Sequence, residues 1–324
     1  MKAIRFYEFG GPEVLKLEEV EAPQPRPGQV LIKVEAAGVN YVDVARRKGI
    51  YLEQIPLPSI PGAEVAGTVV KLGDGVNSVK EGTRVVGLAG GRGYAEYIAL
   101  SATSLASIPR GLDAVQAAAI PLQGLTAYHI LKTSARLQAG ESVLVHAAAG
   151  GMGLFSVQLA KVMGAGKIIA TASTQEKLDL ALSLGADVGV NYTEEGWPEK
   201  VRELTNGKGV NVILEMVGGK NFAQNFQCLA PFGRVIVFGV ASGQPAQLNS
   251  ADLMLKCQAV IGFHLRQVST RPEIMNPSMT ELLNYIVSGR VKLLVNHVFP
   301  LDEAAEAHRQ MENRQTMGKI VLKP

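Results

Sequence analysis

Short runs of β-branched residues recur through the middle of the chain, and their starts lie 21 to 25 residues apart. The six strands predicted from these runs span residues 143–145, 167–171, 188–190, 210–214, 235–238 and 259–263. Helical patterns fill the first two intervals, over 154–163 and 174–184, with Thr174 as the expected N-cap of the second and Gly185 just beyond its end. Strand, helix and strand at this spacing give right-handed crossovers. Residues 122–264 are therefore predicted to form a doubly wound parallel sheet of the Rossmann type.

The two ends of the chain follow a different pattern, in which glycines and prolines separate short or alternating strands. The strands expected in the first 121 residues are 2–6, 15–20, 30–37, 67–72, 84–86 and 97–100. Such a pattern predicts an antiparallel, partly barrel-like sheet. Residues 265–324 add two helical patterns, over 278–288 and 301–312, a short strand near His297 and a last strand at 319–322. This segment has too little apolar surface to fold alone, so we expect it to join residues 1–121 in one domain and to leave a cleft between the two domains.

Composition and charge narrow the class of protein. The chain has 324 residues, of which 47% are hydrophobic and 19% are charged, as expected of a globular protein with two domains. Thirty-two Lys and Arg residues against 29 Asp and Glu residues give a net charge of +3 without a run of like charge, which disfavours a nucleic-acid-binding protein. Two cysteines, no secretory pattern and no apolar membrane span predict a cytoplasmic location.

A glycine-rich turn follows the first strand of the predicted parallel sheet, in the sequence GESVLVHAAAGGMGLFSVQLAK from residue 140 to 161. Ala148, Gly150 and Gly153 occupy the three small-residue positions of a dinucleotide-binding turn that opens a helix. Small residues let backbone N–H groups approach a pyrophosphate, whose charge then lies at the positive end of the helix. We therefore expect this turn to bind a dinucleotide cofactor.

The end of the second strand predicts which dinucleotide binds. An acidic side chain at this position would bind the ribose 2′-OH of NAD and repel the 2′-phosphate of NADP. The position lies near Ser173, where no acid stands, and Lys177 follows on the first turn of the next helix, although Glu176 lies beside it. A hydroxyl and an ammonium group suit a doubly charged phosphate, so we predict a preference for NADPH.

Several motifs together resemble one known family. They are the glycine-rich run above, MKAIRFYEFGGPEVLKLEE at the start, AAGVNYVDVARRKGIY at 36–51, PGAEVAGTVVKLGDGV at 61–76 and the closing MGKIVL. In this order and spacing the chain resembles, over essentially its whole length, the quinone oxidoreductase (zeta-crystallin-like) branch of the medium-chain dehydrogenase/reductases. The resemblance implies a GroES-like catalytic domain, a Rossmann domain, NADPH as cofactor and a homodimer formed through the last Rossmann strand, residues 259–263.

The chain departs from the zinc alcohol dehydrogenase branch of that superfamily at its metal ligands. Asn40 stands in Gly-Val-Asn where that branch has its catalytic-zinc cysteine, and Ala63 stands in Gly-Ala-Glu where that branch has histidine. Val42 takes the place of the proton-relay hydroxyl, and the cysteine-rich zinc lobe is missing. Because zinc needs three or four protein ligands, we expect no metal site, and we expect Glu64 to make hydrogen bonds in the domain core.

Without a metal, the hydride acceptor has to be electrophilic by itself, which indicates quinones or α,β-unsaturated carbonyl compounds. The resemblance implies that Asn40 and Tyr51 lie beside the nicotinamide, and each side chain has a polar hydrogen that a carbonyl oxygen could accept. The alternatives are that Asn40 fixes a loop and that Tyr51 is an aromatic residue of the cleft wall. Asp43 could orient the Asn40 loop.

The remaining cofactor contacts are also implied by the resemblance, with strand ends facing the cleft as ligands of open parallel sheets require. The full set expected to bind NADPH is Asn40, Thr126, Ala148, Gly150, Gly151, Met152, Gly153, Ser173, Lys177, Tyr192, Phe238, Gly239, Phe263, Leu265 and Arg314. The leading function is an NADPH-dependent quinone oxidoreductase. A 2-alkenal or enoyl-thioester reductase, and a non-catalytic NADPH-binding or RNA-binding protein, remain as alternatives.

Overall fold

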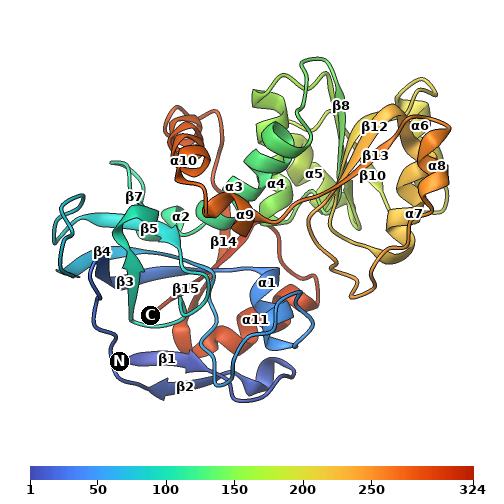
Figure 1. Cartoon of the computed structure of the whole chain (residues 1–324). Helices are drawn as coiled ribbons and strands as arrows, with labels where there is room; N and C mark the ends of the chain where they lie inside the picture. Colours follow the sequence, from blue (N-terminus) through green and yellow to red (C-terminus); the bar gives the residue numbers. More distant parts are fainter. The chain divides into compact units, whose positions relative to one another are not determined.

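The computed structural model describes residues 1–324 and divides into two compact units (Figure 1). Unit 1 comprises Met1–Leu122 and Leu293–Pro324, and unit 2 comprises Gln123–Lys292. The chain thus leaves the first unit and returns to it, as the sequence predicts. The α/β fold class, with one mainly antiparallel and one parallel sheet, is confirmed.

Unit 2 contains a six-stranded parallel sheet in the order β10-β9-β8-β11-β12-β13. The strands are β8 (Ser142–Val145), β9 (Lys167–Ala172), β10 (Val188–Asn191), β11 (Val210–Glu215), β12 (Leu229–Val237) and β13 (Ala259–Gly262). In this order the chain runs outward from β8 to one edge and then from β11 to the other. The carboxyl ends of β8 and β11 therefore flank the point where the order reverses, which is where open α/β sheets bind ligands.

Helices cover both faces of this sheet, with α4 and α5 on one side and α6 and α7 on the other (Figure 1). The helical segments are α3 (Pro121–His129), the π-helical turn η3 (Ile130–Ser134), α4 (Gly151–Val162), α5 (Gln175–Ser183), α6 (Trp197–Leu204), α7 (Gly219–Cys228), α8 (Ser250–Met254), α9 (Leu265–Ser269) and α10 (Pro272–Val287). Thr174 is the N-cap of α5, and its hydroxyl accepts a hydrogen bond from the Lys177 N–H at 3.4 Å, as the sequence predicts. Leu144, Ile213 and Val235 lie fully buried in the core between sheet and helices.

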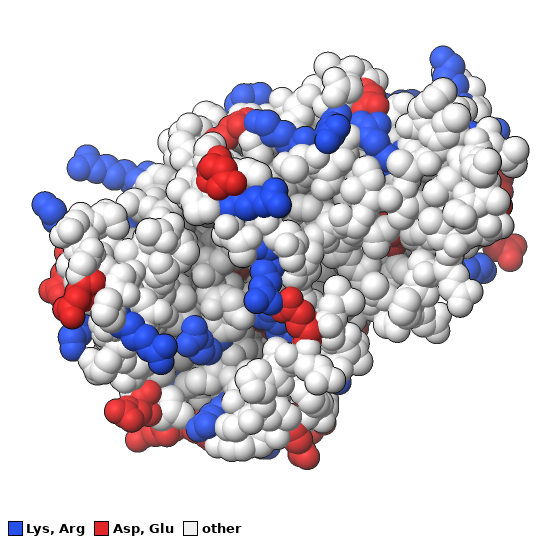
Figure 2. Space-filling view, in the orientation of Figure 1, with Lys and Arg blue, Asp and Glu red and all other residues white.

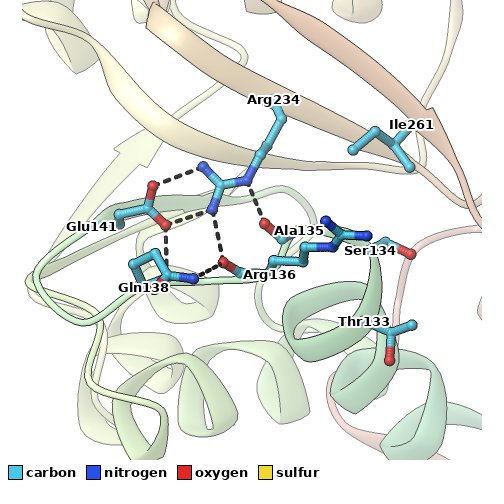
Figure 3. Close-up of a pocket in the computed structure, with 8 residues that line it drawn as sticks. All are labelled: Thr133, Ser134, Ala135, Arg136, Gln138, Glu141, Arg234 and Ile261. Carbon is cyan, nitrogen blue, oxygen red and sulfur yellow. Dashed lines mark hydrogen bonds and ion pairs between the residues drawn. The ribbon is translucent and has the colours of Figure 1, made fainter.

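Arg234 anchors the end of η3 to the sheet (Figure 3). Its guanidinium pairs with both carboxylate oxygens of Glu141 and also donates to the backbone carbonyls of Ala135 and Arg136. This pairing lowers the pKa of the Glu141 carboxyl, with the Arg234 hydrogen bond as the largest cause. The hollow beside these groups has a volume of about 700 Å³, and two of its charged lining residues, Arg234 and Glu141, are already paired with each other.

Unit 1 is built on a sheet in the order β14-β15-β3-β4-β5-β7, with β6 also paired to β3. The strands of this sheet are β3 (Gln29–Val39), β4 (Glu64–Leu72), β5 (Arg84–Leu88), β6 (Tyr97–Ser101), β7 (Leu105–Ser107), β14 (Val295–Pro300) and β15 (Lys319–Lys323). Strands β1 (Lys2–Arg5) and β2 (Lys16–Glu19) form a separate antiparallel pair. The helical segments are η1 (Pro12–Val14), α1 (Tyr41–Arg47), η2 (Ala102–Ser104), α2 (Ala114–Ala117), η4 (Leu301–Glu303) and α11 (Ala304–Glu312). One edge of the long strand β3 pairs first with β6 and then with β15, while its other edge pairs with β4. This double pairing bends the sheet around its buried core.

Three features of the fold differ from the sequence prediction. Strand β7 is not predicted, because three residues are too few to show an alternating pattern. Strands β14 and β15 are parallel, since the helix α11 between them returns the chain in the same direction. The return to unit 1 occurs at Leu293 instead of residue 265, because α9 and α10 belong to unit 2, where Ser278 of α10 bonds to His129 at 2.9 Å. No helix has the length and apolar character needed to cross a membrane.

Candidate functional site

The glycine-rich turn connects β8 to α4 as predicted. Gly150 is the N-cap of α4, and no side chain caps this end of the helix. A Cβ atom added at Gly153 would lie 2.4 Å from the Ala147 carbonyl oxygen and 2.7 Å from the Ala148 Cα, so only glycine fits there. At Gly150 an added Cβ would meet only the Ala147 oxygen, at 3.3 Å.

This turn has the properties of an anion site. The N–H groups of the first helical turn have no partner within the helix, and a glycine N-cap provides none. Aligned peptide dipoles make the same end of the helix positive. Gly151, Met152 and Gly153 form the first turn of the helix, where backbone N–H groups can bind an anion.

No acidic side chain stands at the end of β9. Ser173 follows directly after the strand, and Lys177 lies on the first turn of α5. Tyr192 follows the neighbouring strand β10, and its N–H donates to the Ala172 carbonyl oxygen at 3.2 Å. Ser173, Lys177 and Tyr192 therefore belong to one end of the sheet, whereas Arg314 follows α11 in unit 1 and its contact with a phosphate stays a prediction.

Other residues expected to bind the cofactor follow the carboxyl ends of strands in unit 2. The Phe238 N–H donates to the Glu215 carbonyl oxygen at 3.0 Å, and the Phe263 N–H donates to the Val237 carbonyl oxygen at 2.8 Å. Gly239 follows Phe238, and Leu265 begins α9. Thr126 lies on α3.

Asn40 is held by buried charged groups in unit 1. Its Oδ1 accepts a hydrogen bond from the Lys319 ammonium at 2.7 Å, and its Nδ2 donates to Glu64 Oε1 at 2.7 Å and to the Gly38 carbonyl oxygen at 3.3 Å. Lys319 and Glu64 also form an ion pair, and the second Glu64 oxygen accepts from the Leu122 N–H at 2.7 Å. Glu64 thus makes hydrogen bonds in the core, as expected, and both amide hydrogens of Asn40 are engaged within the protein.

Asp43 orients the loop that carries Asn40. Its carboxylate accepts hydrogen bonds from the Asn40 N–H at 3.0 Å and the Gly62 N–H at 3.1 Å, and the Tyr94 hydroxyl lies 3.4 Å away. Burial raises the pKa of the Asp43 carboxyl to about 6, against the attraction of the nearby Arg46 guanidinium. The carboxylate therefore fixes two backbone segments of the unit at once.

Tyr51 is held at its ring by a cation. The Arg46 guanidinium lies 5.0 Å from the centroid of the Tyr51 ring, and Arg46 Nη1 donates to the Gly90 carbonyl oxygen at 3.1 Å. A cation over the ring face stabilises the ring position without using the phenol group. The structure contains no group of three or more His, Cys, Asp or Glu side chains that could hold a metal ion.

Two buried polar clusters were not predicted from the sequence. One contains Lys319, only 2% exposed, on strand β15, where a lysine within an apolar run was the available signal. The other joins His146, Asn225 and Glu215 in unit 2, and it could be suspected from the charged residue that ends the apolar strand β11.

Family comparisons match both units. Residues 26–110 match the alcohol dehydrogenase GroES-like domain, and residues 151–282 match the zinc-binding dehydrogenase family. A quinone oxidoreductase from Rattus norvegicus is 40% identical over 99% of this chain and 97% of its own length.

Solved structures agree with the sequence relatives. The quinone oxidoreductase of Escherichia coli, solved in complex with NADPH, superposes with a TM-score of 0.95 at 36% identity and full coverage of both chains. A mycobacterial protein, Rv1454c, also solved with NADPH, gives a TM-score of 0.95 at 37% identity, again over the whole of both chains. With such identity over nearly all of both chains, this protein belongs to the quinone oxidoreductase branch of the medium-chain dehydrogenase/reductases, a family of oxidoreductases.

Proposed function

We propose that the protein transfers a hydride from NADPH to a quinone or another activated enone without a metal ion. The observation that carries this proposal is the turn after β8, where a Cβ at Gly153 would meet the backbone and the first turn of α4 is left without a cap. NADPH as cofactor is supported by the absence of an acid at Ser173 and by Lys177 beside it. The E. coli and mycobacterial relatives were solved with NADPH.

NADPH would supply the hydride, which is a proton with two electrons. A quinone also takes up one proton, so the balanced products are the hydroquinone and NADP⁺. The protein's part is to orient both reactants and to stabilise the negative charge that develops on the acceptor oxygen. Because both Asn40 amide hydrogens are engaged with Glu64 and Gly38, we propose that Asn40 has a positioning role and that the Tyr51 phenol donates to the acceptor oxygen.

The test is oxidation of NADPH by the purified protein with a naphthoquinone, a straight-chain 2-alkenal and an enoyl-CoA, with NADH as the control donor. We expect the naphthoquinone to be reduced fastest, and faster with NADPH than with NADH. If the alkenal or the enoyl-CoA were reduced faster, the proposed substrate would be that class of acceptor and not a quinone. Saturable NADPH binding without turnover of any acceptor would overturn the proposal in favour of a binding protein.

Removing the Tyr51 hydroxyl tests its proposed role. In Tyr51→Phe the aromatic ring remains for the Arg46 cation, so the loop is expected to keep its position. Loss of one hydrogen bond to a developing charge should lower kcat/KM for the quinone about 10-fold or more, with unchanged NADPH affinity. Tyr7→Phe, on an exposed tyrosine of the same unit, is the control. Unchanged turnover of every acceptor by Tyr51→Phe would remove the phenol from the mechanism.

Lys177 is proposed to bind the 2′-phosphate of NADPH. Loss of one charge-assisted hydrogen bond in Lys177→Ala should raise the Kd for NADPH about 10-fold and leave the Kd for NADH unchanged. Both constants can be measured by calorimetric titration, with Lys200→Ala, an exposed lysine of α6, as the control. An unchanged ratio of the two constants would show that Lys177 does not determine the preference.

We also propose that two copies associate through β13. This strand pairs only with β12, so its other edge is open. Met254 and Leu255 lie just before β13 in the sequence and are 77% and 91% exposed. Phe232 is 76% exposed, and its N–H donates to the carbonyl oxygen of Lys256, in the segment that leads into β13, at 2.8 Å. An open apolar edge is stabilised by pairing with a second copy.

Sedimentation measurements test this association. The wild type is expected to sediment as a dimer, and Ile261→Arg as a monomer, because a charged side chain on an edge strand disfavours pairing with a second strand. Val287→Arg, at a residue 60% exposed on α10, is the matched control. A monomeric wild type, or a dimeric Ile261→Arg variant, would contradict the proposed edge.

Nucleic-acid binding is not part of the proposal. Figure 2 shows Lys and Arg side chains interspersed with Asp and Glu side chains on the face drawn, without a broad patch of one sign. A net charge of +3 over 324 residues fits the same view.

A further inference from the structure

A chain of buried polar side chains connects three strand ends in unit 2. Its members are Thr171 on β9, His146 directly after β8, Asn225 on α7 and Glu215 at the end of β11, and none is more than 3% exposed. His146 Nδ1 lies 2.9 Å from the Thr171 hydroxyl, and His146 Nε2 lies 2.7 Å from Asn225 Oδ1. Asn225 Nδ2 donates in turn to Glu215 Oε2. We call these four residues the His146 network.

The carboxylate fixes the direction of every hydrogen bond in the His146 network. Because Glu215 can only accept, Asn225 has to turn its Nδ2 toward it and its Oδ1 toward the histidine. His146 therefore donates from Nε2, and in the neutral imidazole its Nδ1 accepts from the Thr171 hydroxyl. Donors that all point the same way polarise one another, which strengthens the series in a buried setting.

The network holds both sides of a strained residue in the phosphate-binding turn. Ala147 has a φ of +48°, a conformation that side-chain-bearing residues rarely adopt. His146 before it is bonded to the Thr171 side chain, and Ala148 after it donates its N–H to the Thr171 carbonyl oxygen at 3.0 Å. The same threonine thus fixes the residues on both sides of Ala147.

The other end of the network shapes a second loop at the same edge of the sheet. Glu215 Oε1 accepts the N–H groups of Val217 at 2.5 Å and Gly218 at 2.8 Å, which orders the turn before α7. That turn bonds to the loop after β12, where the Ser242 N–H donates to the Val217 carbonyl oxygen at 2.9 Å. The turns after β8 and β11 are therefore tied to a single buried carboxylate.

We propose that the His146 network positions the turn after β8 for the pyrophosphate of the cofactor, an inference that rests on the proposed binding of NADPH. His146, Asn225 and Glu215 act through the backbone, as positioning residues. A buried carboxylate is costly and repels a nearby anion, so core packing alone would favour apolar side chains here. In the network, the Glu215 carboxylate instead acts as an acceptor that fixes the directions of the N–H and O–H donors around two turns.

The test compares a variant that breaks the network with one that preserves its bonds. Asn225→Leu removes both central hydrogen bonds at nearly constant volume. It should raise the Kd for NADPH about 10-fold or more, as expected for a displaced binding group, and leave the KM of the acceptor unchanged at saturating NADPH. Glu215→Gln can keep every bond: its Oε1 still accepts from the Val217 and Gly218 N–H groups, and its Nε2 donates to Asn225 Oδ1. The Asn225 amide and the histidine tautomer then invert, which reverses the bonds from Asn225 to Thr171. The Kd of this variant should equal that of the wild type.

Two further variants separate positioning from folding. Thr171→Val removes only the hydroxyl from a strand residue and is expected to raise the Kd for NADPH about 3-fold, even if Asn225→Leu does not fold. Val235→Ala makes a cavity in the buried part of β12 and lowers stability without touching the network, so its Kd should not change.

The outcomes distinguish this inference from the proposed function. If the wild type does not bind NADPH, the proposed function fails. If the wild type binds NADPH and both Thr171→Val and any folded Asn225→Leu bind it equally well, only the positioning role fails. A Kd for Val235→Ala raised as much as that of Thr171→Val would also overturn it, since general destabilisation would then account for the effect.

Discussion

Replacing Gly153 with alanine is expected to weaken NADPH binding about 100-fold, which corresponds to about 2.7 kcal/mol. The new Cβ would lie 2.4 Å from the Ala147 carbonyl oxygen and 2.7 Å from the Ala148 Cα. Both are backbone atoms, so no side-chain rotation can relieve the overlap. The turn or the start of α4 has to move, and a displacement of about 1 Å at a binding group can reduce its effect 100-fold.

The measurement is a titration with NADPH followed by nicotinamide fluorescence, together with the free energy of unfolding from urea denaturation. Leu159→Ala is the control, because this fully buried residue of α4 should cost about 2–5 kcal/mol of stability without changing the turn. An alanine variant at position 153 with the NADPH affinity of the wild type would contradict the role of this glycine.

The strands of the parallel sheet could be predicted because each is a local run of β-branched residues, with glycines in the turns between strands and helices. Each of the six expected strands overlaps an observed one, and β12 alone begins several residues earlier than expected, at Leu229. The turn residues Ala148, Gly150 and Gly153 could also be identified, since steric demand at a tight turn selects small residues in a fixed spacing. Local signals of this kind do not depend on distant parts of the chain.

The division of the chain near residue 293 could not be read from the sequence, because it depends on side chains far apart in sequence. Glu281 of α10 accepts hydrogen bonds from Tyr128 and Lys132, at 2.6 and 2.7 Å. Burial alone would raise the pKa of the Glu281 carboxyl, but these bonds outweigh it and lower that pKa to about 2. Such pairs fix α10 to unit 2, yet neither partner predicts the other. The same reason explains why the partners of Asn40 could not be predicted: Lys319 lies 279 positions away in the sequence.

The second change with a large expected effect on stability is the removal of the Lys319 charge. The Lys319 side chain is 2% exposed, and its ammonium pairs with Glu64 and donates to Asn40 Oδ1 at 2.7 Å. Lys319→Met keeps the length of the side chain and removes the charge, which leaves the Glu64 carboxylate buried without its cation. Breaking a buried pair in this way costs about 3–5 kcal/mol in the free energy of unfolding.

Urea denaturation of Lys319→Met, Glu64→Gln and the double variant can measure this coupling. The double variant is expected to regain part of the stability lost by Lys319→Met, because the neutral amide introduced by Glu64→Gln no longer requires a cation. The oxygen of that amide can accept from the Leu122 N–H while its nitrogen donates to the Oδ1 of an inverted Asn40 amide. Lys323→Met, on the exposed end of the same strand, should change the free energy by less than about 0.5 kcal/mol. If Lys319→Met were as stable as Lys323→Met, the buried ion pair would not hold Asn40 in place. Its amide would then be free to turn toward an acceptor, and the assignment of the proton-donating hydrogen bond to Tyr51 would have to be reconsidered.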